Sequence, residues 1–186
     1  MKAGVRTLGI AESYRERRST LAGAVVRANR VVDGFAFATC TVGGTDSTTA
    51  ITSLFEDLGR EDVRYLLVAG IAPAWFNVVD LHRLHEATGT PVLSVTFEGS
   101  EGLERAIREA FDGEAATQRL ETYRDQPERR PVRVDGETVY VRSVGLADDE
   151  ANDVVRTFTH EGGRPEPVRV ARLAARGVDS FRRETQ

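Results

Sequence analysis

The chain of 186 residues lacks the features that would attach it to a membrane or cross-link it covalently. It has no apolar run near the roughly 20 residues that a membrane-spanning helix needs. Its single cysteine, Cys40, cannot form an internal disulfide. The N-terminal stretch MKAGVRTLGIAES lacks the apolar segment and small-residue cleavage site of a secretory signal. We therefore expect a cytoplasmic protein that does not associate with membranes.

Lysine is almost absent, since Lys2 is the only one and every other basic side chain is arginine. The formal net charge of -4 is mildly acidic, whereas nucleic-acid-binding proteins usually contain a strongly basic domain. This balance does not predict nucleic-acid binding by the protein as a whole. It leaves open a local arginine patch that binds phosphate.

Three strand patterns come first in the chain. VRTLGIAE alternates weakly and predicts a strand that ends near Ala11. TLAGAVVRA and RVVDGFAFATCTV are rich in β-branched residues, and the turn-prone Ala28-Asn29-Arg30 joins them as in an antiparallel hairpin. Cys40 lies in the last run, where a buried, inert thiol is the expected state.

Helices and strands then alternate. The pattern predicts a helix that stops at Gly59, a strand over 64–69, a helix over 77–88, a strand over 91–97 and a helix over 101–112. Since parallel crossovers are right-handed and short connections pair neighbouring elements, the two later strands should join the sheet beside the first strand. This order is typical of a ribonuclease H-like α/β fold with a mixed five-stranded sheet.

The residues from 113 to the C-terminus predict a smaller extension of strands and helices. Residues 113–136 read as a helical extension and a loop, and ETVYVRSVGL reads as an edge strand or as a hairpin with PVRVDG. A helix over 148–158 and a terminal helix after EGGRPEP complete a small C-terminal strand and helix extension. The length suits one core, so we expect a single domain, 1–186.

Two aromatic residues, Trp75 and Phe76, follow the predicted strand 64–69, and ligands of open α/β sheets bind at the carboxyl ends of strands. The two rings could stack on an exposed base or fill the core under the loop. Asn77 and Asp80 straddle the first turn of the next helix, where each could cap the helix or line the cleft. Asp46 is a candidate metal ligand, but helix capping through its carboxylate is the favoured interpretation.

The segment around PEPVR contains three arginines, Arg164, Arg169 and Arg172. They are candidate phosphate contacts, because arginine binds phosphate oxygens through a planar pair of donors. The alternative is that Glu166 and neighbouring acids neutralise them in surface ion pairs.

Several stretches together resemble a known family: RTLGIAES, VVDGFAFATCTVGGTDSTTAI, AGIAPAWFNVVDLHRLHEATGTPVL, YVRSVGL and PEPVRVARL. The chain resembles the uncharacterised archaeal family called domain of unknown function 99 over almost its whole length. That family is similar to endonuclease V, a ribonuclease H-like nuclease that cuts nucleic acid at deaminated purines with magnesium. The resemblance implies carboxylates that converge on a hard cation.

The resemblance also locates those carboxylates, and this chain departs from it. Endonuclease V has acids where this chain aligns Ala11, Ala69 and Arg172. Glu12 is adjacent to the first position but should face the other side of its strand. The departures imply a catalytically degenerate protein that binds nucleic acid or a nucleotide, such as a single-stranded or modified segment, in the former active-site cleft.

Two alternatives remain open. The first is a metal-dependent nuclease with a rearranged site of Glu12, Asp46 and Asp80, which would use Mg²⁺ or Mn²⁺. The second is a protein-interaction module that presents the Trp-Phe loop or an unpaired edge strand to a protein partner.

Overall fold

The computed structural model describes residues 1–14, 17–160 and 162–184. Seven strands of the described chain form one mixed sheet in the order β3-β2-β1-β4-β5-β7-β6. The strands are β1 (Arg6–Tyr14), β2 (Arg18–Arg27), β3 (Val32–Thr41), β4 (Val63–Ala69), β5 (Val92–Thr96), β6 (Arg130–Val134) and β7 (Glu137–Val144). The helices are α1 (Ser47–Leu58), α2 (Pro73–Phe76), α3 (Leu81–Thr88), α4 (Glu104–Ala110), α5 (Gly113–Arg124), α6 (Asp148–Phe158) and α7 (Glu166–Glu184).

The first five strands have the predicted arrangement. β1, β2 and β3 pair antiparallel in sequence, with a tight turn between β2 and β3. β4 runs parallel to β1, and β5 runs parallel to β4. The expectation that the two later strands lie beside the first is therefore confirmed, although β1 continues past Ala11 to Tyr14.

The predicted strand number is wrong, because the sheet has seven strands and not five. β7 pairs antiparallel with β5, and β6 pairs with β7, so the expected C-terminal extension continues the main sheet. β5 would otherwise be an unpaired edge. Val139 and Val141 of β7 are buried and pack with Phe158 of α6, which fixes the hairpin to the core.

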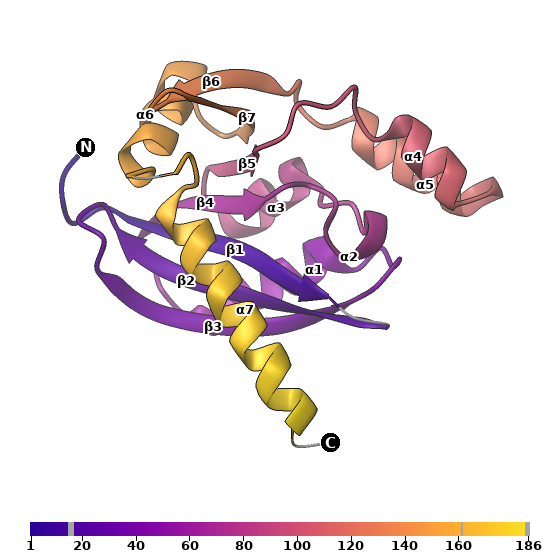
Figure 1. Cartoon of the computed structure of the whole chain (residues 1–186), viewed down its shortest axis with the longest axis horizontal. Coiled ribbons are helices and arrows are strands. Elements are labelled where there is room, and N and C mark those ends of the chain that lie inside the picture. The colour runs from indigo at the N-terminus through magenta and orange to yellow at the C-terminus, as the bar shows by residue number, and fades with distance from the viewer. Residues whose placement is uncertain (15–16, 161, 185–186) are drawn as a thin grey trace.

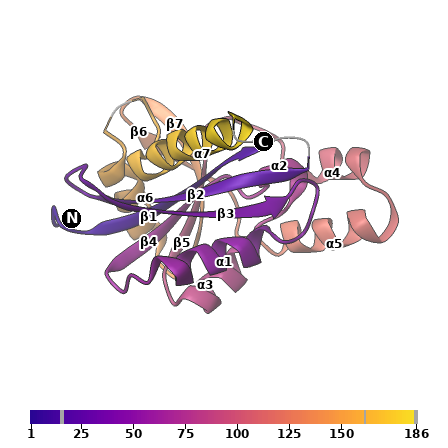
Figure 2. The same cartoon turned by 90° about the horizontal axis from the view of Figure 1, so that it is seen from below.

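Helices cover both faces of the sheet (Figures 1 and 2). α1 and α3 lie on one face, and α6 and α7 lie on the other. The apolar residues of β4 pack on both faces of the sheet. Leu66 and Val68 belong to the hydrophobic cluster under α1 and α3, and Leu67 belongs to the cluster under α6. α4 and α5 form an arm at one end of the molecule (Figure 1). No helix within the described residues is long and apolar enough to cross a membrane.

The helix predicted over 77–88 begins later than expected. α3 starts at Leu81, after Asp80, and ends at Thr88, which Gly89 follows in the left-handed conformation. The preceding residues form the short α2 segment, in which Ala74, Trp75 and Phe76 have φ of 48°, 59° and 56°. Left-handed backbone at three consecutive non-glycine residues cannot continue into a right-handed helix.

Candidate functional site

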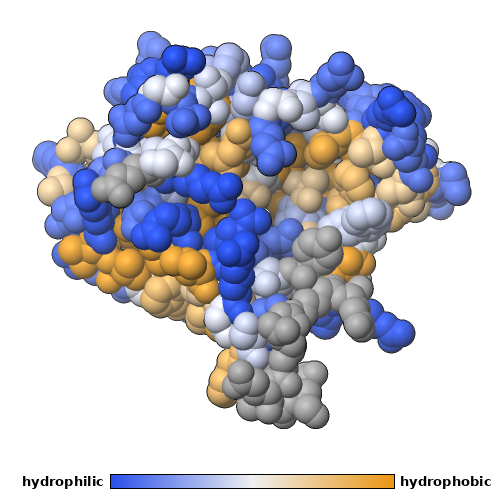
Figure 3. Space-filling view, viewed as in Figure 1, coloured by the Kyte–Doolittle hydropathy of each residue, from blue (hydrophilic) through white to orange (hydrophobic). Residues whose placement is uncertain are grey.

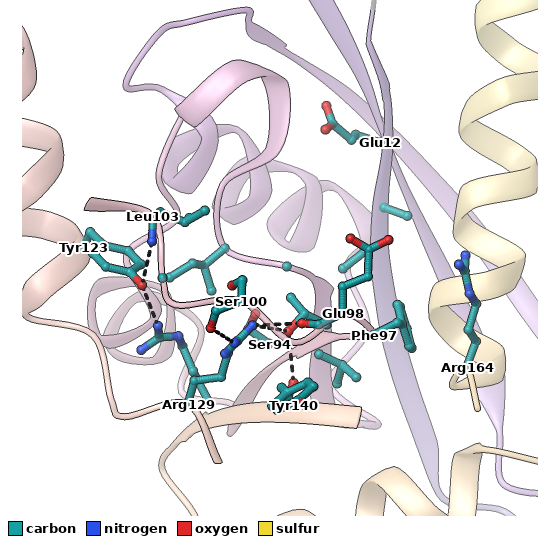
Figure 4. Close-up of a pocket in the computed structure, with 18 of the residues that line it drawn as sticks. Glu12, Ser94, Phe97, Glu98, Ser100, Leu103, Tyr123, Arg129, Tyr140 and Arg164 are labelled. Atoms are coloured by element: carbon teal, nitrogen blue, oxygen red, sulfur yellow. Dashed lines mark hydrogen bonds between the residues drawn. The ribbon is translucent and has the colours of Figure 1, made fainter. Parts of the chain in front are cut away.

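A cavity of about 410 Å³ lies at the carboxyl ends of β1, β4 and β5 (Figure 4). β7 and the segments around α4 and α5 complete its wall. Ala11, Ala69 and Arg172 all line it. The structure therefore brings together the three positions at which the resemblance implies acids.

Four arginines and two carboxylates line this cavity, so its charged side chains are predominantly positive. Arg129 and Arg142 belong to the wall formed by β7 and the segment before β6. Arg164 and Arg172 approach from the segment before α7 and from α7 itself. The carboxylates are Glu12 and Glu98. An anion is the ligand that this charge distribution favours.

Arg129 and Arg142 are held in place by backbone oxygens and aromatic rings. Arg129 donates to the carbonyl oxygens of Glu98 at 3.2 Å and Ser100 at 2.6 Å, and its guanidinium lies 4.5 Å from the Tyr140 ring centroid. Arg142 donates to the Pro127 carbonyl and to the Tyr123 hydroxyl, the latter at 3.3 Å. Burial lowers the pKa of Arg142, but a guanidinium remains a cation at neutral pH.

Arg164 and Arg172 are less constrained. The Arg164 guanidinium lies 4.7 Å from the Phe97 ring centroid. Neither Arg164 nor Arg172 makes a hydrogen bond or ion pair with another described residue. Arg169, by contrast, donates to both Glu166 oxygens at 2.6 and 2.7 Å, which lowers the pKa of Glu166. The ion-pair alternative thus applies to Arg169, and Arg164 and Arg172 keep their donors available.

Glu12 faces away from Ala11, as strand alternation predicts. Ala11 packs against Ala171 of α7. The Glu12 carboxylate accepts hydrogen bonds from the Ala74 N–H at 2.9 Å and from the Ser19 hydroxyl at 2.5 Å. Glu12 therefore fixes the left-handed α2 segment to β1, in addition to lining the cavity.

Trp75 and Phe76 lie outside the core and outside the cavity wall among the described residues. Trp75 is 53% exposed, and its ring packs edge-on against Phe76 with centroids 5.4 Å apart. Phe76 packs against Phe111 at the end of α4. The two rings thus form an aromatic surface between α2 and the α4–α5 arm, and they do not plug the core.

Asn77 is buried and joins three segments. Its side-chain oxygen accepts from the Ser47 N–H at 2.9 Å, and its amide nitrogen donates to the Thr41 carbonyl at 2.8 Å and to Asp46 at 2.7 Å. Asn77 does not reach the cavity. Its amide connects the end of β3, the start of α1 and the α2 segment.

The expected helix cap by the Asp46 side chain is wrong. Asp46 precedes α1, but its carboxylate turns back and accepts from the Thr41 N–H and hydroxyl and from Asn77. Burial alone would raise the pKa of Asp46, but the hydrogen bonds from Thr41 and Asn77 lower it below its ordinary value. Asp80 instead caps α3 by accepting from the Arg83 N–H at 3.1 Å.

Glu12, Asp46 and Asp80 are not assembled into a metal site. Each is held by different partners, and no group of three or more His, Cys, Asp or Glu side chains within the described residues could hold a metal ion. The residues present in the cavity do not fit the divalent cation that the resemblance implies, because its wall has two carboxylates and four arginines.

The wall residues that sequence reasoning missed include Tyr123, Arg129, Tyr140 and Arg142. They lie in the part of the chain predicted as an extension. Tyr140 and Arg142 are placed by the register of β7 beside β5, opposite Thr96 and Ser94, whereas Arg129 directly precedes β6 and Tyr123 belongs to α5. No local pattern in the sequence specifies that pairing.

Comparison with known proteins places this architecture in a family. Residues 3–179 match the family described as Endonuclease dU, so the chain belongs to that family. A UPF0215 protein of Pyrobaculum calidifontis is 35% identical over 94% of this chain and 97% of its own length. The crystal structure of a protein of unknown function from Archaeoglobus fulgidus matches with a TM-score of 0.83 and 27% identity, over 93% of this chain and 97% of that one.

The fold is similar to that of endonuclease V. The Ciona intestinalis enzyme, solved in complex with a 24mer DNA that contains an inosine followed by a ribo-adenosine, matches with a TM-score of 0.62 and 11% identity. The match covers 95% of this chain and 86% of that chain. These findings confirm the suspected resemblance to an uncharacterised archaeal family related to endonuclease V.

Proposed function

We propose that the chain binds nucleic acid, or a nucleotide, in the cavity at the carboxyl ends of β1, β4 and β5, and that it does so without the carboxylate chemistry of endonuclease V. The observation that carries this proposal is the pair Arg164 and Arg172, whose guanidinium groups line the cavity without a hydrogen-bonding partner among the described residues. A phosphate group supplies the charge and the acceptors that these donors require.

The rest of the wall suits the other parts of a nucleotide. Tyr123, Tyr140 and Phe97 offer aromatic surface for a base, and base stacking contributes about 1–3 kcal/mol per base. A volume of about 410 Å³ is within the size range of small-ligand pockets. The DNA bound to the Ciona intestinalis endonuclease V supports a nucleic-acid ligand for a chain of the same fold.

The other candidate residues have different parts in this proposal. The exposed Trp75 ring and the half-buried Phe76 ring extend the binding surface toward the α4–α5 arm as an aromatic platform. Asn77 and Glu12 position that platform through their hydrogen bonds. Arg169 lies outside the cavity wall and is paired with Glu166, so we assign it no contact with the ligand.

We also propose a fold class and a domain organisation for the chain. The order β3-β2-β1-β4-β5 supports a ribonuclease H-like classification, and the continuous sheet supports a single domain, 1–186. The cytoplasmic location is a prediction from the sequence.

The nuclease alternative retains one supporting observation, which is the description of the family as Endonuclease dU. Glu12 and Glu98 are the carboxylates that line the cavity. A nuclease reaction in this cavity would depend on them, since Asp46 and Asp80 are absent from its wall. We therefore include a cleavage assay in the test below.

The test uses fluorescence anisotropy with labelled single-stranded oligonucleotides that contain deoxyuridine, inosine or neither. Binding should be measurable at low salt and should weaken as salt rises, because phosphate contacts release counterions. Arg172→Ala should weaken binding about tenfold or more, since a hydrogen bond to a charged group contributes about 1.5–3 kcal/mol. Arg64→Ala, an exposed arginine of β4 outside the cavity, is the matched control and should leave affinity unchanged.

Absence of binding at low salt would contradict the proposal. Equal effects of Arg172→Ala and Arg64→Ala would show that binding does not use the cavity. The same tubes, supplied with Mg²⁺ or Mn²⁺, report on cleavage. Cleavage that disappears in Glu12→Gln would favour the nuclease alternative over a noncatalytic binder.

A further inference from the structure

The outer edge of β3 has an unusual pattern of open backbone groups. β3 stands at one end of the sheet, so one of its edges faces no strand of the described chain. The Val42 N–H points toward β2 and donates to the Arg17 carbonyl at 3.0 Å, whereas the N–H and C=O of Thr41 bond to Asp46 and Asn77 on the outer side. Because alternate residues point the same way, the backbone groups of Phe35, Phe37 and Thr39 also point outward.

The two ends of this edge are covered, and its centre is open. At one end Arg60 donates to the Asp33 carbonyl at 3.1 Å. At the other end the Thr41 N–H donates to Asp46, and the Thr41 carbonyl accepts from Asn77. Between these ends, no described residue outside the sheet hydrogen-bonds to the backbone of Phe35, Phe37 or Thr39. The open stretch is therefore centred on Phe37.

The side chains of this stretch carry no charge, and two of the three outward-bonding residues are phenylalanines. Phe35 and Phe37 are 47% and 45% exposed, and their rings stack with centroids 6.3 Å apart. The run GFAFATCTV contains no charge and no proline, although 29% of the chain is charged. Exposed edge strands usually carry such residues to prevent pairing. Figure 3 shows hydrophobic residues gathered along the lower border of the molecule, where β3 lies in Figure 1.

We propose that this edge joins two copies of the chain, with β3 paired antiparallel to β3 of a second copy about a twofold axis at Phe37. In this register Phe37 lies opposite Phe37 of the second copy, and Phe35 lies opposite Thr39 in both directions. Each opposed pair exchanges two backbone hydrogen bonds. The outward groups of all three residues are thereby used.

The pattern of covered groups favours a second copy over an unrelated protein. In the same register Asp33 lies opposite Thr41 of the second copy. Backbone groups that already have a partner within their own chain therefore face each other, and the unpaired backbone groups of Phe35, Phe37 and Thr39 face unpaired groups of the second copy. Asp33 is the one charged residue of β3, and Arg6 and Arg27 neutralise it at 2.6 Å. Self-pairing thus places no unpaired like charges in opposition. β2 lies between this edge and the strands of the cavity, so the contact is independent of the proposed function.

The test measures the mass of the full chain by light scattering and sedimentation over a concentration series. The expected species is a dimer of the 20.4 kDa chain. Phe37→Lys should give a monomer, since two ammonium groups would meet at the axis. Leu173→Lys, which places the same charge at an exposed apolar residue of α7, should leave the dimer intact. Thr39→Pro removes one outward N–H and keeps both phenylalanines, and it should weaken the dimer at least tenfold while the circular dichroism spectrum stays unchanged.

Cross-linking tests the register. Cys40 is buried, so a new exposed cysteine reacts with little background. Phe37→Cys should form an interchain disulfide under mild oxidation, because opposed Cα atoms in a hydrogen-bonded pair are about 5.5 Å apart. Phe35→Cys should not, because the two copies of residue 35 would lie about 13 Å apart along the strands. A monomer at every concentration would overturn the proposal. So would a dimer that survives both Phe37→Lys and Thr39→Pro, or one that cross-links equally through both cysteine variants.

Discussion

A substitution at Gly9 of β1 tests most directly how closely α7 packs against the sheet. A Cβ atom at Gly9 would lie 2.1 Å from the carbonyl carbon and 2.3 Å from the carbonyl oxygen of Pro167, in the first turn of α7. These are backbone atoms, so no side-chain rotation can relieve the contact. Gly9→Ala therefore requires the start of α7 to move away from β1.

The size of that movement sets the expected cost. Reaching ordinary van der Waals contact at about 3.4 Å needs a shift of more than 1 Å, and Ala171 of α7 is packed in one cluster with Ala11 of β1 and Ala24 of β2. Overpacking of this kind typically costs about 1–3 kcal/mol. For a chain of this length each kcal/mol lowers Tm by about 2–4 °C, so Gly9→Ala should lower Tm by about 2–12 °C.

The matched control is Gly177→Ala in the same helix. No heavy atom lies within 4 Å of the position that its Cβ would occupy. Alanine in place of a helical glycine should stabilise the protein by about 0.5–1 kcal/mol. Differential scanning calorimetry and urea unfolding of both variants give the comparison. A Gly9→Ala protein as stable as the wild type would refute the inferred approach of α7 to β1.

Two further predictions concern polar networks. Asp33, whose pKa falls from 3.8 to about 2 through hydrogen bonds from Arg27 and Arg6, should stabilise the fold above pH 4 and lose this effect as pH falls toward 2. The Tm difference between wild type and Asp33→Asn should therefore shrink over that range, whereas Asp57→Asn on the exposed side of α1 should show no such trend. Asn77→Ala leaves the Ser47 N–H and the Thr41 carbonyl without this partner, at about 1–3 kcal/mol for each group left unsatisfied. Urea unfolding should show that loss, with Asn29→Ala in the exposed turn costing less than about 1 kcal/mol; equal costs would contradict the role given to Asn77.

The sequence predicts the part of the fold that depends on neighbouring elements. The hairpin of β2 and β3 follows from two β-branched runs around a short turn, and the position of β4 beside β1 follows from the handedness of crossovers. The pairing of β7 with β5 was missed because it joins distant segments. Alternation in ETVYVRSVGL specifies which residues face the core, but it does not specify which strand edge the segment will join.

The α2 segment shows a second limit of sequence reasoning. Left-handed backbone usually occurs at glycine, which makes it recognisable in a sequence, yet Ala74, Trp75 and Phe76 all adopt it. Its stability comes from outside the segment, since Glu12 accepts from the Ala74 N–H and the Ala74 carbonyl accepts from the Gly43 N–H at 2.7 Å. No local pattern could predict this conformation because its causes lie on β1 and after β3.

For the site, the sequence was informative where one segment supplies the chemistry. Arg164 and Arg172 follow from PEPVR and line the cavity, whereas Arg142 depends on the unpredicted strand pairing. The cap assigned to Asp46 failed for a related reason. Thr41 and Asn77 offer its carboxylate three donors from two other segments, and these replace the helix N–H groups that a capping side chain would use.

The three positions at which the resemblance to endonuclease V implies acids lie close to α7 or on it. Ala11 is 3% exposed and packs with Ala171, so a carboxylate at position 11 would be buried against an apolar helix unless a cation neutralised it. Ala69 packs at the edge of the same cluster, and Arg172 follows Ala171 at the mouth of the cavity. Small apolar residues thus allow α7 to lie close to β1, and the guanidinium of the same helix gives the cavity a preference for anions. A carboxylate placed at position 11 alone would therefore meet an apolar helix and a cavity wall that still has four arginines.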